Sequence, residues 1–86
     1  MLEVTVTRSA DSLLRELGRR GLVVKLETVE AKRNARHWHV GFEKKPGVLE
    51  ITDLGDTCEL KVASNRDGGW AMSLARELSS STPSTR

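Results

Sequence analysis

The sequence predicts an α+β fold, a two-layer sandwich in which two helices pack on one face of an antiparallel sheet of four to five strands. The expected element order is β-α-β-β-β-β-α. Several short segments alternate apolar and polar residues, as strands do when one face is buried. Two longer segments repeat apolar residues at i, i+3, i+4 and i+7, which is typical of amphipathic helices. Both helices need an apolar surface to cover, and the inward face of the sheet provides one.

The first two elements are a strand and a helix. Residues 2–7 alternate apolar and polar side chains, which predicts a short strand. Ser9 is the expected N-cap of the helix that follows, and Gly18 or Gly21 is expected to end it. The apolar stripe of this helix comprises Ala10, Leu13, Leu14 and Leu17.

The next two strands are expected over residues 22–29 and 36–42, joined by the loop 30–34. In the first of them the side chains expected to face inward are Leu22, Val24 and Leu26. In the second, Trp38, Val40 and Phe42 share one face, and both histidines of the chain, His37 and His39, share the other. The histidines are therefore expected on the solvent face of the sheet.

The last strands are expected around Leu49–Ile51 and Thr57–Ala63, after a turn at residues 44–47. Gly55-Asp56 fits a two-residue hairpin loop, and this loop predicts Glu50 opposite Lys61 and Ile51 opposite Leu60. For the preceding strand pair the prediction is Phe42 opposite Leu49, which places His39 opposite Thr52. Pairing Val24 with Phe42 would place Glu27 opposite His39.

The final helix is expected to begin at an Asp67 N-cap. Its apolar stripe comprises Ala71, Leu74, Ala75 and Leu78. Residues 1–79 are predicted to form a single domain, and the Ser/Thr/Pro-rich residues 80–86 a disordered tail.

Composition narrows the class of protein. The chain has 86 residues, which suits one domain. It has no run of about 18 apolar residues, so no membrane span is expected, and no secretory signal pattern is visible. Its one cysteine, Cys58, cannot form an internal disulfide and falls on an apolar strand face. A cytoplasmic location is the resulting prediction.

Positive charge is concentrated in the first half of the chain. The net charge is +2, with 10 Lys/Arg against 6 Asp/Glu in residues 1–45 and 4 against 6 in residues 46–86. Such a half can attract a polyanion, although an ordinary solvated surface has the same composition. The candidate nucleic-acid-binding residues are Arg19, Arg20, Lys32, Arg33, Arg36, Lys44 and Lys45.

The two histidines are the candidates for chemistry. His39, with His37, is a candidate general acid or base for metal-free RNA cleavage, if Glu27, Arg36 and Lys25 lie nearby. A zinc site would need a third and usually a fourth ligand, and no established metal-binding motif is present. No metal site and no cofactor are therefore expected.

One family resemblance bears on this chemistry. Residues 13–18 (Leu-Leu-Arg-Glu-Leu-Gly), followed by a strand and then a histidine-bearing strand, resemble the opening of HicA-type toxins. That resemblance covers about the first half of the chain and implies a double-stranded-RNA-binding-like fold and RNA cleavage through a histidine. The chain lacks the Gly-Ser that usually precedes the histidine in those toxins, and it has an extra strand at 57–63.

The sequence predicts three alternative functions, of which the first is preferred. The first is a small accessory or regulatory binding module that contacts duplex or structured nucleic acid through the basic hairpin and helix end. The second is a protein-interaction or dimerisation module acting through a sheet edge, either the N-terminal strand or the strand ending near Ala63. An apolar patch of Val23, Val29 and Leu54 would support this second function. The third is a histidine-dependent ribonuclease.

Overall fold

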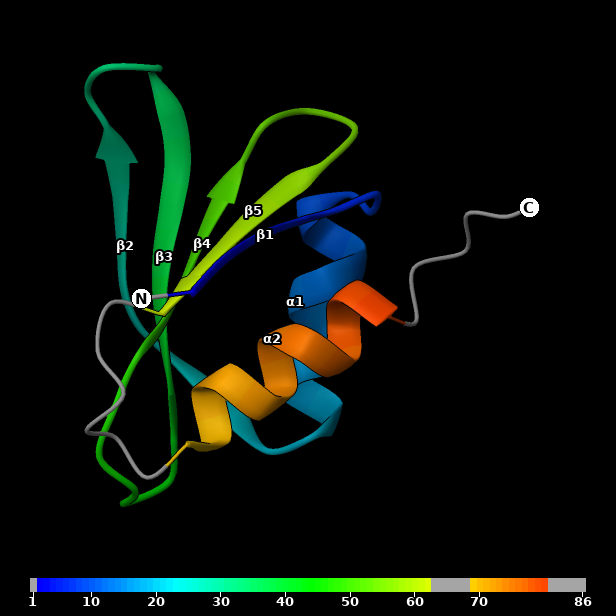
Figure 1. Cartoon of the computed structure of the whole chain (residues 1–86). Helices are drawn as coiled ribbons and strands as arrows, with labels where there is room; N and C mark the ends of the chain where they lie inside the picture. Colours follow the sequence, from blue (N-terminus) through cyan, green and yellow to red (C-terminus); the bar gives the residue numbers. More distant parts are fainter. Residues whose placement is uncertain (1, 63–68, 81–86) are drawn as a thin grey trace.

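A computed structural model describes residues 2–62 and 69–80 of the chain, and its element order is the predicted one (Figure 1). The elements are β1 (Leu2–Val6), α1 (Ala10–Arg19), β2 (Leu22–Glu30), β3 (Ala35–Phe42), β4 (Leu49–Asp53), β5 (Cys58–Val62) and α2 (Trp70–Ser80). The predicted Asp67 cap and residues 81–86 of the predicted tail lie outside the described residues, whereas Ser80, predicted to begin the tail, is the last residue of α2.

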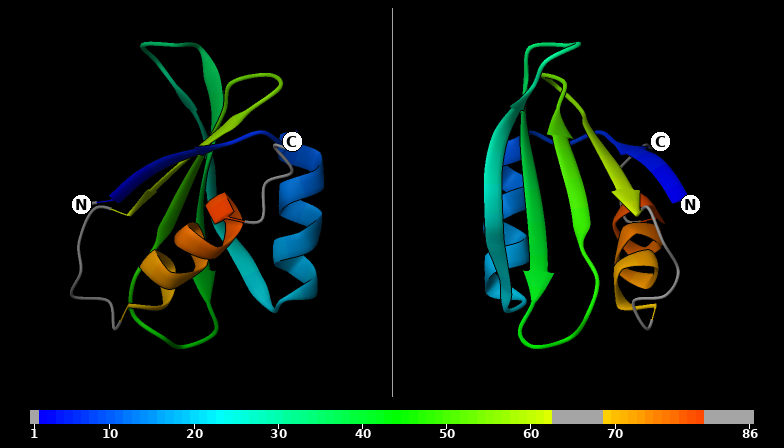
Figure 2. Two further views of the ribbon diagram at one scale, coloured as in Figure 1. Left: turned by 45° about the vertical axis from the view of Figure 1, so that its right-hand side comes forward. Right: turned by 90° about the vertical axis from the view of Figure 1, so that its left-hand side faces the viewer.

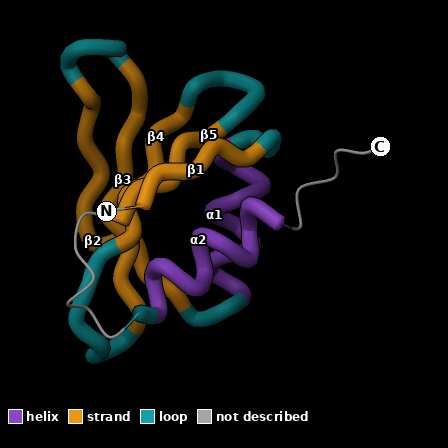
Figure 3. The backbone as a smooth tube through the Cα atoms, in the orientation of Figure 1, coloured by secondary structure: helices purple, strands orange, loops and turns teal. Residues whose placement is uncertain are grey.

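The five strands form one antiparallel sheet in the order β1-β5-β4-β3-β2. Both helices lie on the same side of this sheet (Figures 1 and 2), with α1 against β2 and α2 against β1, β5 and β4. Among the described residues no helix lies on the other face, and the loops gather at the two ends of the strands (Figure 3). Within the described part of the chain, no helix has the length and apolar character needed to cross a membrane.

The core lies between the sheet and the helices, as the apolar patterns predict. Trp38 and Val40 are buried on the helix side of β3, and Phe42 is half-buried beside them. Both predicted helical stripes are confirmed. All their residues are buried except Leu14 of α1, which is half-buried. The buried helical residues are Ala10, Leu13, Leu17, Ala71, Leu74, Ala75 and Leu78.

The predicted ends of α1 are confirmed. Ser9 has extended backbone angles, and its Oγ accepts a hydrogen bond from Ser12 N at 3.2 Å, which satisfies one of the free N–H groups of the first turn. After the helix, Gly21 N donates to Gly18 O at 3.1 Å, and Gly21 has φ +90°. That left-handed conformation suits glycine and turns the chain into β2.

The predicted β4–β5 register is confirmed, and the predicted β3–β4 register is wrong. Glu50 lies opposite Lys61 and Ile51 opposite Leu60, and Leu54 N donates to Thr57 O at 2.9 Å around Gly55-Asp56. Between β3 and β4, His39 lies opposite Glu50 instead of Thr52. A hairpin loop of only two residues, as between β4 and β5, allows little choice of register. The connection 43–48 between β3 and β4 has six residues, so the strands can shift by two residues while their apolar faces still match.

The predicted inward orientation of β2 is wrong for Leu26, whereas Val24 keeps the predicted side opposite Val40 without being buried. Leu22 is buried, but Val24 and Leu26 are 45% and 49% exposed. A β-bulge at Lys25 shifts the register, because Val24 pairs with Val40 whereas Leu26 pairs with His39. An extra residue reverses the alternation of side chains along a strand, so Leu26 changes to the open face of the sheet.

The buried thiol of Cys58 makes stability depend on pH. Burial, followed by the charge of Asp53, raises the pKa of this fully buried cysteine from 9.0 to about 11. The unfolded chain therefore loses the thiol proton at lower pH than the folded chain does. This contribution to stability is complete below pH 9 and is lost as pH rises toward 11, by roughly 2 to 3 kcal/mol. Comparison of the unfolding free energies of the wild type and Cys58→Ala over this range should show that difference, and parallel curves would contradict it.

Candidate functional site

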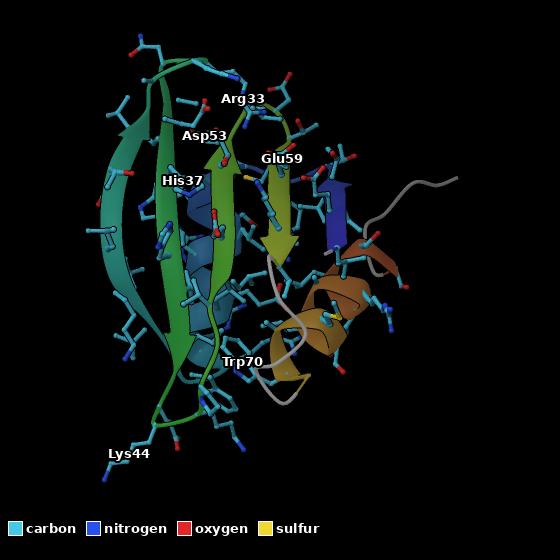
Figure 4. All side chains as sticks on the ribbon, turned by 60° about the vertical axis from the view of Figure 1, so that its left-hand side comes forward. Arg33, His37, Lys44, Asp53, Glu59 and Trp70 are labelled. Atoms are coloured by element: carbon cyan, nitrogen blue, oxygen red, sulfur yellow. The ribbon has the colours of Figure 1, made fainter. Side chains whose placement is uncertain are left out.

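The two histidines lie on the helix-free face of the sheet, as the alternation along β3 predicts. They meet two side chains of β4, since His39 pairs with Glu50 and His37 with Thr52 across the β3–β4 ladder. Figure 4 views the molecule with this side of the sheet forward and labels His37. The four side chains together, called here the histidine cluster, are His37, His39, Glu50 and Thr52.

One carboxylate oxygen joins the two imidazoles. Glu50 Oε1 lies 3.3 Å from His37 Nε2 and 3.9 Å from His39 Nε2. The two rings pack edge to face with centroids 5.1 Å apart. The side chains of His37 and Glu50 are 15% and 23% exposed, and that of His39 is 35% exposed. The cluster is therefore partly shielded from water and open on the His39 side.

Thr52 fixes the orientation of the His37 ring. Its Oγ1 lies 2.7 Å from His37 Nδ1, and Thr52 is only 3% exposed. When Nδ1 carries the ring proton and donates it to Thr52, the lone pair of His37 is on Nε2. That nitrogen is the one that faces Glu50.

The residues expected to assist RNA cleavage do not gather around the histidines. Glu27 pairs with Trp38 across the β2–β3 ladder and lies on the helix side of the sheet. Arg36 also lies on that side, where its Nη2 is 2.9 Å from Glu27 Oε2 and its guanidinium lies over the Trp38 ring. Only Lys25 is on the open face, with its methylene chain over Gly41. The predicted Glu27–His39 pair is therefore wrong.

The candidate nucleic-acid-binding residues divide between two ends of the molecule. Figure 4 shows Arg33 at the β2–β3 hairpin end and Lys44 at the opposite end of the sheet. Lys32 and Arg36 belong to the first group, and Lys45 to the second, where its Nζ lies 5.8 Å from the Phe42 ring centroid. Arg19 is the last residue of α1, and Arg20 is its C-cap. One continuous basic surface does not result.

Glutamates already neutralise three of these arginines. Arg20 Nη2 lies 2.8 Å from Glu77 and 2.9 Å from Glu16. Arg33 contacts Glu59 at 3.0 Å and Glu30 at 3.1 Å, and these two carboxylates raise the pKa of its guanidinium. Arg36 is paired with Glu27, as described above. Each pair reduces the positive potential available to a phosphate.

The edge strand β2 is a second surface feature. Its side chains from Val23 to Val29 are all exposed. Val23, Val24, Leu26 and Val29 are 54%, 45%, 49% and 61% exposed, respectively. The expected patch of Val23, Val29 and Leu54 does not form on one face, because Val23 pairs with Gly41 on the open face and Val29 with Arg36 on the helix side.

Glu50 is the functional residue that sequence reasoning missed at the histidine cluster. Moving the β3–β4 pairing by two residues keeps Trp38 and Val40 against apolar partners, Ile51 and Leu49. That alternative register places a carboxylate beside a histidine, a favourable cross-strand pair, and comparing the two registers would have found it.

Comparison of the chain with protein-family models, with curated proteins and with solved structures finds no match.

Proposed function

We propose that this chain is a binding module whose binding element is the exposed edge of β2, and that the strand seated there is β2 of a second copy. The observation that carries the proposal is the nine-residue edge strand with four exposed large apolar side chains. An edge strand offers unpaired backbone groups to another strand, and natural edges are usually short, charged or covered. The opposite edge, β1, has five residues, two of them exposed.

The bulge at Lys25 favours an identical partner. Antiparallel pairing of two β2 strands about Leu26 places Leu26 opposite its own copy on the open face. With both bulges left out of the pairing, Glu27 then faces Val24, Thr28 faces Val23, and Val29 faces Leu22. In every pair the two side chains lie on the same face of the sheet, given their partners on β3. An identical strand carries the matching irregularity, and a two-fold axis uses it twice.

This register brings no like charges together. Glu27 meets a valine, and Lys25 lies in the bulge. The pairing extends the sheet continuously from one chain into the other and covers Leu26 and Val29 in both. Burial of such half-exposed aliphatic side chains is favourable by roughly 1 kcal/mol each.

Nucleic-acid binding through the basic hairpin stays a prediction. It is less well supported than the β2 edge, because the basic residues are divided between two ends and three arginines have carboxylate partners. For location we propose the cytoplasm, which is supported by a single cysteine that is buried as a free thiol.

Sedimentation velocity over a wide range of protein concentration tests the proposed dimer. The wild type should shift from monomer to dimer as concentration rises. Leu26→Lys places two ammonium groups face to face at the two-fold axis, so it should weaken the dimer at least tenfold, or about 1.4 kcal/mol. EDTA in every sample excludes association through metal ions.

Val48→Lys is the matched control. Val48 is another exposed aliphatic residue, 39% exposed, in the β3–β4 connection away from β2, and its replacement should leave the dimer unchanged. Circular dichroism should show both variants folded. A wild type that stays monomeric at millimolar concentration would refute self-association, and a dimer unaffected by Leu26→Lys would refute the β2 interface.

A further inference from the structure

We propose that His37, His39 and Glu50 form a binding site for one divalent transition-metal ion, with Zn²⁺ as the ion that suits the ligands best. Nitrogen and oxygen ligands of these three side chains all lie within 4.8 Å of one another. Two imidazoles and one carboxylate match the three-ligand zinc sites that keep a fourth position for water. The site is independent of the proposed dimer, because all three ligands belong to one chain.

The spacing of His37 and Glu50 already suits a tetrahedral ion. Zinc bonds of 2.0–2.1 Å at tetrahedral angles place neighbouring ligand atoms about 3.3 Å apart. His37 Nε2 and Glu50 Oε1 are 3.3 Å apart, and His39 Nε2 is 3.9 Å from the same oxygen. The ligand atoms of the three side chains lie up to 4.8 Å apart, so the His39 ring, the most exposed of the three side chains, has to move toward the other two when an ion binds.

The strand geometry holds the ligands in place. Alternation along β3 places the two histidines on one face, and the ladder places Glu50 directly opposite His39. Sites built on regular strands are held more accurately than sites on loops.

A hydrogen bond behind His37 completes the arrangement. A metal-binding histidine usually donates its other ring N–H to a neighbouring oxygen, which fixes the ring and raises its basicity. The buried Thr52 hydroxyl, 2.7 Å from His37 Nδ1, is in the position to accept that bond.

The nearest cation across the ladder is drawn away from the site. Lys61 lies opposite Glu50 on β5, and its Nζ is 4.0 Å from Glu3 Oε2 on β1. On the other side, the ladder partners of the histidines on β2 are Leu26 and Thr28, which carry no charge, and Lys25 in the bulge lies with its side chain over Gly41. Among the described residues, the contacts of the Glu50 carboxylate with titratable groups are therefore those with the two imidazoles, at 3.3 Å and 3.9 Å.

Zinc titration of the full chain, after EDTA treatment and dialysis, tests the site. Calorimetry should give one Zn²⁺ per chain. In ¹⁵N spectra of the histidine rings, Nε2 of both His37 and His39 should shift, while Nδ1 of His37 keeps its proton. The affinity should not depend on protein concentration, since one chain supplies every ligand.

Four variants complete the experiment. His39→Ala and Glu50→Gln should each remove the one-to-one binding, whereas Glu59→Gln, a carboxylate on the same face but paired with Arg33, should leave it unchanged. Thr52→Val should weaken binding by about 10–100-fold, and Thr52→Ser should restore it. No binding at millimolar Zn²⁺, binding that survives His39→Ala, or one ion per two chains would each overturn the proposal.

Discussion

Replacement of Trp38 by alanine is expected to lower the free energy of unfolding by about 3 to 5 kcal/mol, the range for truncating a buried aromatic residue to a methyl group. Trp38 is 2% exposed and is among the largest fully buried side chains of the core. It lies on the central part of β3, opposite Ile51 of β4. A domain of 86 residues has a stability of roughly 4 to 13 kcal/mol, so this one change removes a large part of it.

The cavity left by removal of the Trp38 ring accounts for most of this loss of stability. The Arg36 guanidinium lies 4.8 Å from the Trp38 ring centroid, but such a contact at an exposed site contributes only about 0.5–1 kcal/mol. Urea denaturation followed by circular dichroism measures the loss. Trp70→Ala is the control, because Trp70 is half-buried and packs at the edge of the core, and it should cost less. A loss below about 1.5 kcal/mol for Trp38→Ala would contradict the central role of the ring.

Leu13→Ala is expected to cost about 2 to 5 kcal/mol, the usual range for a buried leucine. Leu13 is fully buried in the layer between α1 and the sheet. Its nearest apolar neighbour along the helix is Leu14. Leu14 is the matched control, since it has the same chemistry on the same helix and is only half-buried.

For Leu14→Ala the expected loss is roughly 1 kcal/mol. Both variants keep the helix propensity high, because alanine is the best helix former, so the difference between them reports packing alone. Chemical denaturation of the two variants under one set of conditions measures it. Equal losses would mean that α1 is rotated relative to the packing described here.

The elements of this fold can be predicted from the sequence because each has a local signal. Ser9 and Gly21 mark the ends of α1, and the helical stripes mark the buried faces of both helices. The Gly55-Asp56 loop determines the β4–β5 register, since a two-residue hairpin allows little else. Three features have no comparable local signal: the β3–β4 register, the bulge at Lys25 and the pairing of β1 with β5. Each is decided by packing between distant segments.

The same distinction explains the histidine cluster. Alternation along β3 is local, so the shared face of His37 and His39 could be predicted. Their neighbours depend on registers across long connections, and a shift of two residues replaces the expected partner of His39, Thr52, by Glu50. The bulge at Lys25 removes the other expected partner, Glu27, to the helix side.

The pairing of β1 with β5 has a consequence for how the chain folds during synthesis. Leu2 pairs with Val62, so the first strand of the sheet to be made must wait for the last one. At ordinary rates of translation, roughly 5–20 residues per second, the delay is several seconds. The β2–β5 meander is joined by short connections and can form first, since local contacts have the lowest loop-closure cost. Docking of β1 on β5 then completes the sheet, and a nascent β1 is exposed to trapping by other strands until that moment.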